Sequence, residues 1–218
     1  MTNLDVEIAD WREWLELGTR LSLCAGVHAP SAFSALLSST MSSCAGRTVI
    51  DAGSGAGLVT IAALLAGVTQ VIAIDNDPAA LRVTAHNVAE VLGPAGTDRL
   101  TTLELDFADL GGVSADLLAV NPPQRPARIL SAVEPDQRHL HEGGGEDGLH
   151  TLRLVLAHAT TATVRTTAAG ALAIADLQTE RLAAPTLVTR QLLPLHPAWA
   201  KLDEAADQVG VWEFDTRS

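Results

Sequence analysis

The 218-residue chain is poor in several residue types, and each shortage excludes a class of protein. Its two cysteines, Cys24 and Cys44, form no CxxC pair and no metal-binding spacing. We expect both to be buried small apolar residues in a reducing compartment. No apolar run reaches the roughly 18 residues of a membrane span. The start, "MTNLDVEIADWREW", lacks the basic and apolar regions of a signal peptide. The sequence therefore predicts a cytoplasmic protein with no membrane segment.

Positive charge is also scarce. Lys201 is the only lysine, and 14 basic residues against 26 acidic ones give a net charge of −12. An extended nucleic-acid interface needs Lys and Arg to displace counterions along the phosphates. The charge balance therefore disfavours nucleic acid as a partner, although it leaves room for a local basic pocket. The oligomeric state is not indicated.

Short apolar segments alternate with helical patterns after residue 45. We predict strands over 48–51, 70–75, 99–106, 115–120 and 170–177, with weaker candidates near 186–193 and 208–215. We predict helices over 58–67, 77–93 and 147–166. The alternation is typical of an α/β domain with a Rossmann-like, mostly parallel sheet and helices on both faces.

Residues 1–45 carry two helical patterns, one over 5–17 capped by Asp5 and one over 31–41 capped by Ser31. They are too short for an independent domain. We expect a helical N-terminal extension over 1–45 that covers the cleft of a ligand-binding domain over 46–218.

The stretch "DAGSGAG" places Gly53, Gly55 and Gly57 between a strand and a helix, where glycine allows positive φ and close backbone approach. A dinucleotide site would need GxGxxG, but the third glycine position holds Leu58. Asp51, two residues before the first glycine, suits a cationic or amino-bearing ligand better than a pyrophosphate.

Acidic residues end the next two predicted strands. Asp75 stands where a carboxylate can bind both hydroxyls of a ribose. Asp106 can accept an adenine amino hydrogen, and Phe107 beside it can pack on the ring. Each acid alone is more often a helix cap. Together, at the carboxyl ends of parallel strands, they predict a nucleoside-type ligand.

The segments "VIDAGSGAG", "IAID" and "LDF" resemble the first three motifs of the class I S-adenosylmethionine-dependent methyltransferases, over roughly residues 25–176. The resemblance implies a seven-stranded sheet whose last strand is antiparallel, and S-adenosyl-L-methionine as cofactor. The cofactor-binding residues that it implies are Asp51, Gly53, Ser54, Gly55, Gly57, Asp75, Asn76, Asp106, Phe107 and Asn121.

The turn "NPPQ" over 121–124 resembles the (N/D)PP(Y/F/W) motif of amino- and amide-N-methyltransferases. "EGGGEDGLHTLR" is similar to a segment of the glutamine N5-methyltransferases that act on release factors. The resemblance implies catalytic roles for Asn121, Pro122 and Gln124, with Asn121 and Pro122 orienting the acceptor nitrogen. Transfer from a sulfonium needs no metal, so we expect none, although His139, His141 and Glu142 are spaced closely enough to be weak candidates.

Two departures from that family concern the substrate. Gln124 replaces an aromatic residue, and 45 residues precede the core where the release-factor enzymes carry a larger helical substrate domain. We therefore expect a small polar metabolite as partner, methylated on nitrogen or on oxygen. Candidate substrate-binding residues are His28, Pro123, Arg125 and His141. The alternatives are methylation of a protein glutamine or of a nucleic-acid base, and a nucleoside-binding module without catalysis, which the intact NPP disfavours.

Overall fold

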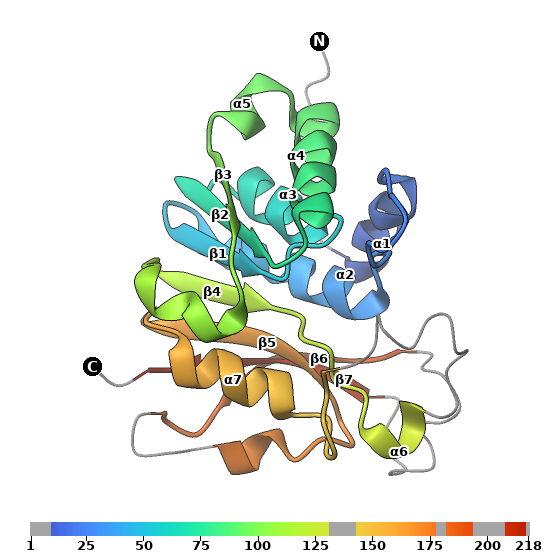
Figure 1. Cartoon of the computed structure of the whole chain (residues 1–218), viewed down its shortest axis with the longest axis vertical. Coiled ribbons are helices and arrows are strands. Elements are labelled where there is room, and N and C mark those ends of the chain that lie inside the picture. The colour runs from blue at the N-terminus through green and yellow to red at the C-terminus, as the bar shows by residue number, and fades with distance from the viewer. Residues whose placement is uncertain (1–9, 131–142, 178–181, 194–207, 217–218) are drawn as a thin grey trace.

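The computed structural model describes residues 10–130, 143–177, 182–193 and 208–216 (Figure 1). They contain one seven-stranded sheet of order β3-β2-β1-β4-β5-β7-β6. Its strands are β1 (Thr48–Ala52), β2 (Gln70–Asp75), β3 (Leu100–Glu104), β4 (Leu117–Val120), β5 (Thr163–Ala169), β6 (Thr186–Leu192) and β7 (Gln208–Asp215). The pairs among β1 to β5 are parallel, and β7 runs antiparallel to both β5 and β6. The predicted fold class is confirmed.

Two of the helices precede β1, and the others lie between strands along the chain. The helices are α1 (Trp11–Arg20), α2 (Ala32–Ser39), α3 (Leu58–Leu65), α4 (Pro78–Leu92), α5 (Pro94–Thr97), α6 (Ala127–Leu130) and α7 (His150–His158), with 3₁₀ turns η1 (Met41–Cys44), η2 (Phe107–Gly112) and η4 (Ile174–Leu177). Local sequence signals determine where several of these helices begin. Asp77 caps α4 ahead of Pro78, and Ser31 caps α2 through a capping box, as predicted. None of the helices in the described ranges is long and apolar enough to cross a membrane.

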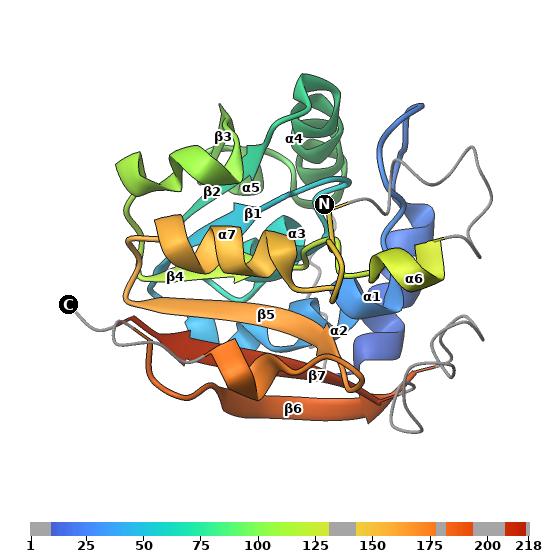
Figure 2. The ribbon, with the colours of Figure 1, turned by 60° about the horizontal axis from the view of Figure 1, so that its bottom comes forward.

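The sheet separates two hydrophobic cores, because successive strand residues point to opposite faces. In β1, Val49 joins the core shared with α1 to α4, whereas Ile50 joins the core shared with α7 and η2. Leu117 and Leu118 of β4 divide in the same way. Helices therefore cover both faces, as a largely parallel sheet requires (Figures 1 and 2).

Three predictions of local structure were wrong. The helix predicted over 147–166 ends at His158, and the fifth strand is 163–169 rather than 170–177. β-Branched residues in "TTATVRTT" favour a strand, and all seven residues of β5 are buried. Asp10, not Asp5, caps the first helix, and residues 1–9 lie outside the described part. Cys44 is buried as expected, but Cys24 is exposed.

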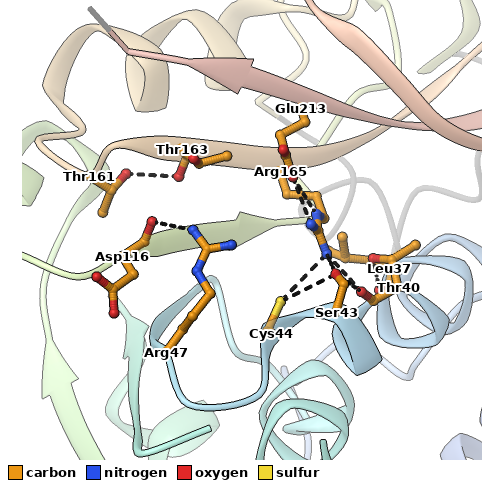
Figure 3. A network of polar contacts seen from close by, with 10 residues as sticks. All are labelled: Leu37, Thr40, Ser43, Cys44, Arg47, Asp116, Thr161, Thr163, Arg165 and Glu213. Atoms are coloured by element: carbon orange, nitrogen blue, oxygen red, sulfur yellow. Dashed lines mark hydrogen bonds and ion pairs between the residues drawn. The ribbon is translucent and has the colours of Figure 1, made fainter. Parts of the chain in front are cut away.

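Arg165 connects the N-terminal helices to the sheet (Figure 3). Its side chain projects from β5, and one guanidinium nitrogen lies 2.7 Å from Oε2 of Glu213 on β7. Another nitrogen donates to the Thr40 carbonyl at 2.7 Å and to the Ser43 hydroxyl at 3.1 Å. Arg165 is only 5% exposed, so this charge is satisfied almost entirely by protein groups. The network holds the end of α2, and with it the segment that precedes α2, against the sheet.

Candidate active site

A cavity of about 790 Å³ opens at the carboxyl ends of β1 to β4. The structure brings most of the predicted site residues to its wall, namely His28, Asp51, Gly53, Ser54, Gly55, Asp75, Asn76, Asp106, Phe107, Asn121, Pro122, Pro123, Gln124 and Arg125. Residues 26–34, which lead into α2 and form its first turn, make up another part of the wall. His141, like His139 and Glu142, lies outside the described residues.

The glycine turn after β1 uses its own amide groups internally. The N–H groups of Gly53 and Ser54 both donate to the Ile74 carbonyl, at 2.8 and 2.9 Å. Gly55 N–H donates to Asp75 at 3.0 Å, and Gly57 N–H to the Ser54 carbonyl at 2.8 Å. A pyrophosphate site needs such amides free to face the ligand. This turn instead leaves oxygen acceptors for a ligand that carries N–H groups or positive charge.

Asp51 adds a buried carboxylate to the same wall. It is 2% exposed and accepts a hydrogen bond from the Thr60 hydroxyl, in the first turn of α3, at 2.6 Å. Burial raises the pKa of Asp51 to about 6, more than the Thr60 hydrogen bonds lower it. The Asp51 carboxylate lies at the N-terminus of α3. Its negative charge therefore already interacts with the positive end of the helix dipole. A cationic ligand would stabilise this buried carboxylate, whereas an anionic ligand would be repelled by it.

Two further carboxylates continue the wall along the sheet edge. Asp75 is held by the Gly55 and Asp77 amides, each at 3.0 Å, which leaves lone pairs on both oxygens. Asp106 caps η2 by accepting from Ala108 N–H at 3.0 Å through one oxygen. The Phe107 ring packs over the glycine turn, so close that a Cβ on Gly53 would lie 3.3 Å from it. A flat ring system has a face to pack on beside Asp106.

Gly57 has a different place from that predicted. It does not line the cavity; instead its φ is +84°, and a Cβ there would come within 3.1 Å of Thr84 on α4. Glycine at this position permits close packing of the turn against α4. Its contact with a cofactor stays a prediction.

The NPPQ turn follows β4 and faces the cavity. The Asn121 side-chain oxygen accepts a hydrogen bond from the Thr167 hydroxyl at 2.7 Å. Gln124 is 8% exposed, and its side-chain oxygen accepts from Ala169 N–H at 2.9 Å. The Gln124 amide group is thus directed toward β5, and the catalytic role that the resemblance implies for Gln124 stays a prediction.

Comparison with known proteins agrees with this geometry. A family model described as ribosomal protein L11 methyltransferase matches residues 15–107. The chain is 30% identical to the ribosomal protein L11 methyltransferase of Pectobacterium atrosepticum over 66% of its length and 56% of that relative's. It is 36% identical to the release factor glutamine methyltransferase of Gloeobacter violaceus over 54% of its length, and 42% of that relative's. The chain thus spans about half the length of the curated relatives it matches.

Solved structures share the whole fold. One is a Pyrococcus horikoshii protein provisionally described as an RNA methyltransferase, with a TM-score of 0.62, 16% identity and coverage of 95% of this chain and 98% of that one. Another is the E. cuniculi Mtq2–Trm112 complex that methylates the eRF1 termination factor, with a TM-score of 0.59, 16% identity and coverage of 88% and 99%. At these identities they show the fold alone.

The chain has the fold of the class I S-adenosylmethionine-dependent methyltransferases and is similar in sequence to members of that class.

The cofactor of this class, S-adenosylmethionine, suits the residues of the cavity. Its sulfonium and amino groups are positive, which matches the buried Asp51 and a turn in which the amides of Gly53, Ser54, Gly55 and Gly57 are already bonded within the chain. Asp75 has acceptors for ribose hydroxyls, and Asp106 with Phe107 suits an adenine. An NAD-type ligand would place a pyrophosphate against the amides already used.

The prediction of a small-molecule partner was wrong. Curated relatives that match this chain are named for protein substrates, among them ribosomal protein L11, a release factor and, at 36% identity in Bordetella pertussis, ribosomal protein uL3. The prediction inferred substrate size from the length of the N-terminal segment and from the residue type at position 124. The segment length does not report on what enters the cavity, and the Gln124 side chain is turned toward β5.

Two residues at the site were missed from the sequence. Thr60 lies nine positions after Asp51, in the turn of a helix that the sequence did predict, so its contact was within reach of spacing arguments. Thr167 lies on the strand that was misplaced, so its contact with Asn121 was hidden. The run of β-branched residues around it was the available signal.

We expect cofactor affinity to weaken in acid because of Asp51. Its pKa in the folded chain, about 6, is raised from 3.8, so protonation begins as the pH falls through about 6. The neutral acid no longer attracts a cation, and the Kd for S-adenosylmethionine should rise by up to about tenfold per pH unit below that point. Calorimetric titration between about pH 7.5 and 5 measures this.

The matched controls for this prediction are Asp51→Asn and Asp109→Asn. Asparagine at position 51 keeps the shape of the side chain but does not ionise. The Asp51→Asn variant should therefore bind S-adenosylmethionine weakly, with a Kd that does not change over the same pH range. Asp109 is exposed and does not line the cavity, so its variant should keep the wild-type profile. A wild-type profile that is equally flat would contradict the prediction.

Proposed function

We propose that this chain transfers the methyl group of S-adenosylmethionine to a nitrogen of a protein, specifically the side-chain amide of a glutamine. The observation that carries the proposal is the Asn121–Pro122 turn at the carboxyl end of β4, facing the same cavity as the cofactor carboxylates. The release factor and uL3 relatives are both named as glutamine methyltransferases, which supports this acceptor. Such substrates also fit the cytoplasmic location predicted from the sequence.

The turn would act by holding an amide nitrogen in one orientation. The sulfonium of the bound cofactor makes its methyl group electrophilic. An amide nitrogen is a weak nucleophile, so its lone pair must be aimed and its water removed. Asn121 Oδ1 and the Pro122 carbonyl are two acceptors for its two N–H groups, and neither the Pro122 carbonyl nor the free lone pair of Asn121 is used by the described residues. Positioning of this kind supplies roughly 7–11 kcal/mol in favourable cases.

Pro122 and Pro123 make that geometry rigid. A proline has a fixed φ, so two in succession leave the turn few alternative conformations and little entropy to lose when the acceptor binds. The Gln124 amide then anchors the far end of the turn to β5. We propose that Pro123 also contacts the substrate, since it lies on the cavity wall beside these acceptors.

The charges on the cavity wall follow the strand order. The four aspartates, Asp51, Asp75, Asp77 and Asp106, lie at or just after the ends of β1, β2 and β3. The acceptor side, beyond β4, carries Arg125 and His150 instead. His28 also lines the cavity, with its carbonyl near Gly55 of the glycine turn, and we propose that its side chain contacts the substrate. Arg125 has no ion-pair partner among the described residues, and burial lowers its pKa. We propose that Arg125 binds a carboxylate close to the methylated residue of the substrate.

Replacing Arg125 should weaken substrate binding without affecting the cofactor. We expect Arg125→Gln to raise the KM for the acceptor protein about tenfold, the size of a lost charged hydrogen bond, while the Kd for S-adenosylhomocysteine stays within about twofold. Arg128→Gln is the control, because Arg128 is exposed and does not line the cavity. A higher Kd for S-adenosylhomocysteine with an unchanged KM would instead assign Arg125 to the cofactor carboxylate.

We also propose that residues 1–45 form an extension that closes the cleft of a domain over 46–218. The residues that support this are 26–34, which line the cavity, and Arg165, which holds the end of α2. In this arrangement the extension would restrict how the acceptor residue enters.

The experiment that tests the proposed function is a labelling screen. The chain is incubated with methyl-tritiated S-adenosylmethionine and unmethylated ribosomal protein L11, ribosomal protein uL3 or a bacterial release factor, and the modified residue is located by mass spectrometry. We expect label on a glutamine of uL3 or of the release factor. Label on a residue type other than glutamine would reject glutamine as the acceptor. Binding of S-adenosylhomocysteine without transfer to any of these proteins would favour a module without catalysis.

A further inference from the structure

Thr167 lies behind the NPPQ turn rather than in the cavity. It is 1% exposed on β5, the strand next to β4, and it is not part of the cavity wall. Its hydroxyl oxygen lies 2.7 Å from Asn121 Oδ1, a normal distance for a good O–H···O hydrogen bond. The Asn121 amide therefore has one side against β5 and the other toward the cavity.

The direction of this hydrogen bond follows from the groups around it. The oxygen and nitrogen of a side-chain amide are similar in shape, so only their partners tell which is which. Ala169 N–H can only donate, so the Gln124 atom 2.9 Å from it is the oxygen. The Gln124 NH₂ group then faces Thr167, 3.4 Å from its carbonyl oxygen and 3.5 Å from its hydroxyl oxygen.

The Gln124 NH₂ group can only donate hydrogen bonds, so on that side the Thr167 hydroxyl oxygen acts as the acceptor. Its own proton is then directed to Asn121, whose facing atom must be the oxygen. The backbone of β5 thus sets, through Gln124 and Thr167, which end of the Asn121 amide faces β5. The 3.4 and 3.5 Å contacts are long, so they bias the direction, whereas the 2.7 and 2.9 Å bonds hold the side chains.

We propose that Thr167 is a positioning residue for methyl transfer, which orients Asn121 so that the second lone pair of Oδ1 faces the acceptor nitrogen. This rests on the proposed role of Asn121. An amide oxygen has two lone pairs, and Thr167 takes the one on the β5 side. Without the hydroxyl, the Asn121 amide is free to rotate or to turn its NH₂ group toward the acceptor. The Asn121 NH₂ group would then face an N–H group of the acceptor amide, and two donors cannot form a hydrogen bond with each other.

The same network explains Gln124. At this position the motif of the amino- and amide-N-methyltransferases has an aromatic residue. Here the side chain makes hydrogen bonds to β5, so Gln124 contributes by bracing the turn and by setting the direction of the Thr167 proton. The chain thereby holds Asn121 through hydrogen bonds to the neighbouring strand.

The kinetic test replaces Thr167 by valine, which keeps the shape and removes the hydroxyl. With the protein labelled in the screen above as acceptor, we expect kcat to fall about tenfold, while the Kd for S-adenosylhomocysteine stays within about twofold. Thr167→Ser keeps the hydroxyl and should recover most of the rate. Thr163→Val, on the same face of the same strand four residues earlier, is the control and should be fully active.

A spectroscopic test needs no acceptor. The chain has four asparagines, Asn3, Asn76, Asn87 and Asn121, so a sample labelled with ¹³C and ¹⁵N at asparagine gives few side-chain signals. With S-adenosylhomocysteine bound, the Asn121 carbonyl carbon should shift upfield in Thr167→Val, because it loses a hydrogen bond, and should not move in Thr163→Val. An unmoved signal would overturn the proposal.

Other results would also overturn it. A fully active Thr167→Val enzyme would do so, as would a serine variant that is as slow as the valine one. A slow variant whose melting temperature and cofactor affinity fall in step would mean a purely structural role. Failure of the proposed function can be told apart from failure of this proposal. A fully active Asn121→Ala variant would show that Asn121 itself has no role in methyl transfer.

Discussion

Replacing Asn121 by alanine should lower kcat about 100-fold or more and leave binding of S-adenosylhomocysteine within about twofold. The side-chain oxygen is one of two acceptors that aim the substrate nitrogen, and loss of alignment by about 1 Å costs a factor of this size. The cofactor contacts of Asp51, Asp75 and Asp106 lie on other strands, so they should remain. Single-turnover rates with the labelled acceptor protein, together with calorimetric Kd values, measure the two effects.

Asn121→Asp is the matched control for this prediction. It keeps an oxygen that accepts from Thr167 and another that faces the cavity, and the motif that the turn resembles has either Asn or Asp at this position. We therefore expect it to be faster than the alanine variant. Equal rates for alanine and wild type would remove Asn121 from the reaction, whatever the nature of the acceptor.

Replacing Arg165 by methionine should destabilise the folded chain by about 3 kcal/mol, the low end of the cost of breaking a buried ion pair, because the Glu213 side chain left behind is 28% exposed. The substitution leaves the Glu213 carboxylate without its cation and removes one of the two donors to the Thr40 carbonyl, the other being the Ser43 hydroxyl, while methionine keeps much of the volume (Figure 3). Unfolding in urea, with linear extrapolation to water, measures the change.

Arg47→Met provides the comparison within the same region. Arg47 donates a single hydrogen bond to the Asp116 carbonyl at 2.8 Å in a more exposed setting, so its loss should cost about 1 kcal/mol or less (Figure 3). Equal losses for the two variants would show that Arg165 is no more important than a surface arginine. Because Arg165 holds the end of α2, its variant should also bind S-adenosylhomocysteine more weakly, whereas Arg47→Met should not.

The parts of the site that were predictable depend on short-range sequence signals. The strand, the glycine turn and the following helix lie within residues 48–67, and Asp75 and Asp106 each end a short strand. Since parallel strands in such a sheet meet ligands at their carboxyl ends, the sequence alone assigns the acids to one edge of the sheet. Caps such as Ser31 and Asp77 were equally local.

The fifth strand was not predictable in this way. The residues of 159–169 alternate too weakly to separate a buried strand from a helix, and periodicity alone cannot decide between them. Burial on both faces decided it, because β5 lies between β4 and β7 and all its residues are covered. The position of Thr167, and so its contact with Asn121, depended on this strand.

By itself, the sequence determined the fold class, the acids at the strand ends, the place of the NPPQ turn and the preference for a cationic nucleoside ligand. Only the tertiary structure decided the partner of each polar group. It showed that the Ile74 carbonyl takes two amides of the glycine turn, that Gln124 faces β5 and that Thr167 donates to Asn121. The physical reason is that these partners are 20 to 46 positions apart, and only the packing of strands against one another brings them within hydrogen-bonding distance.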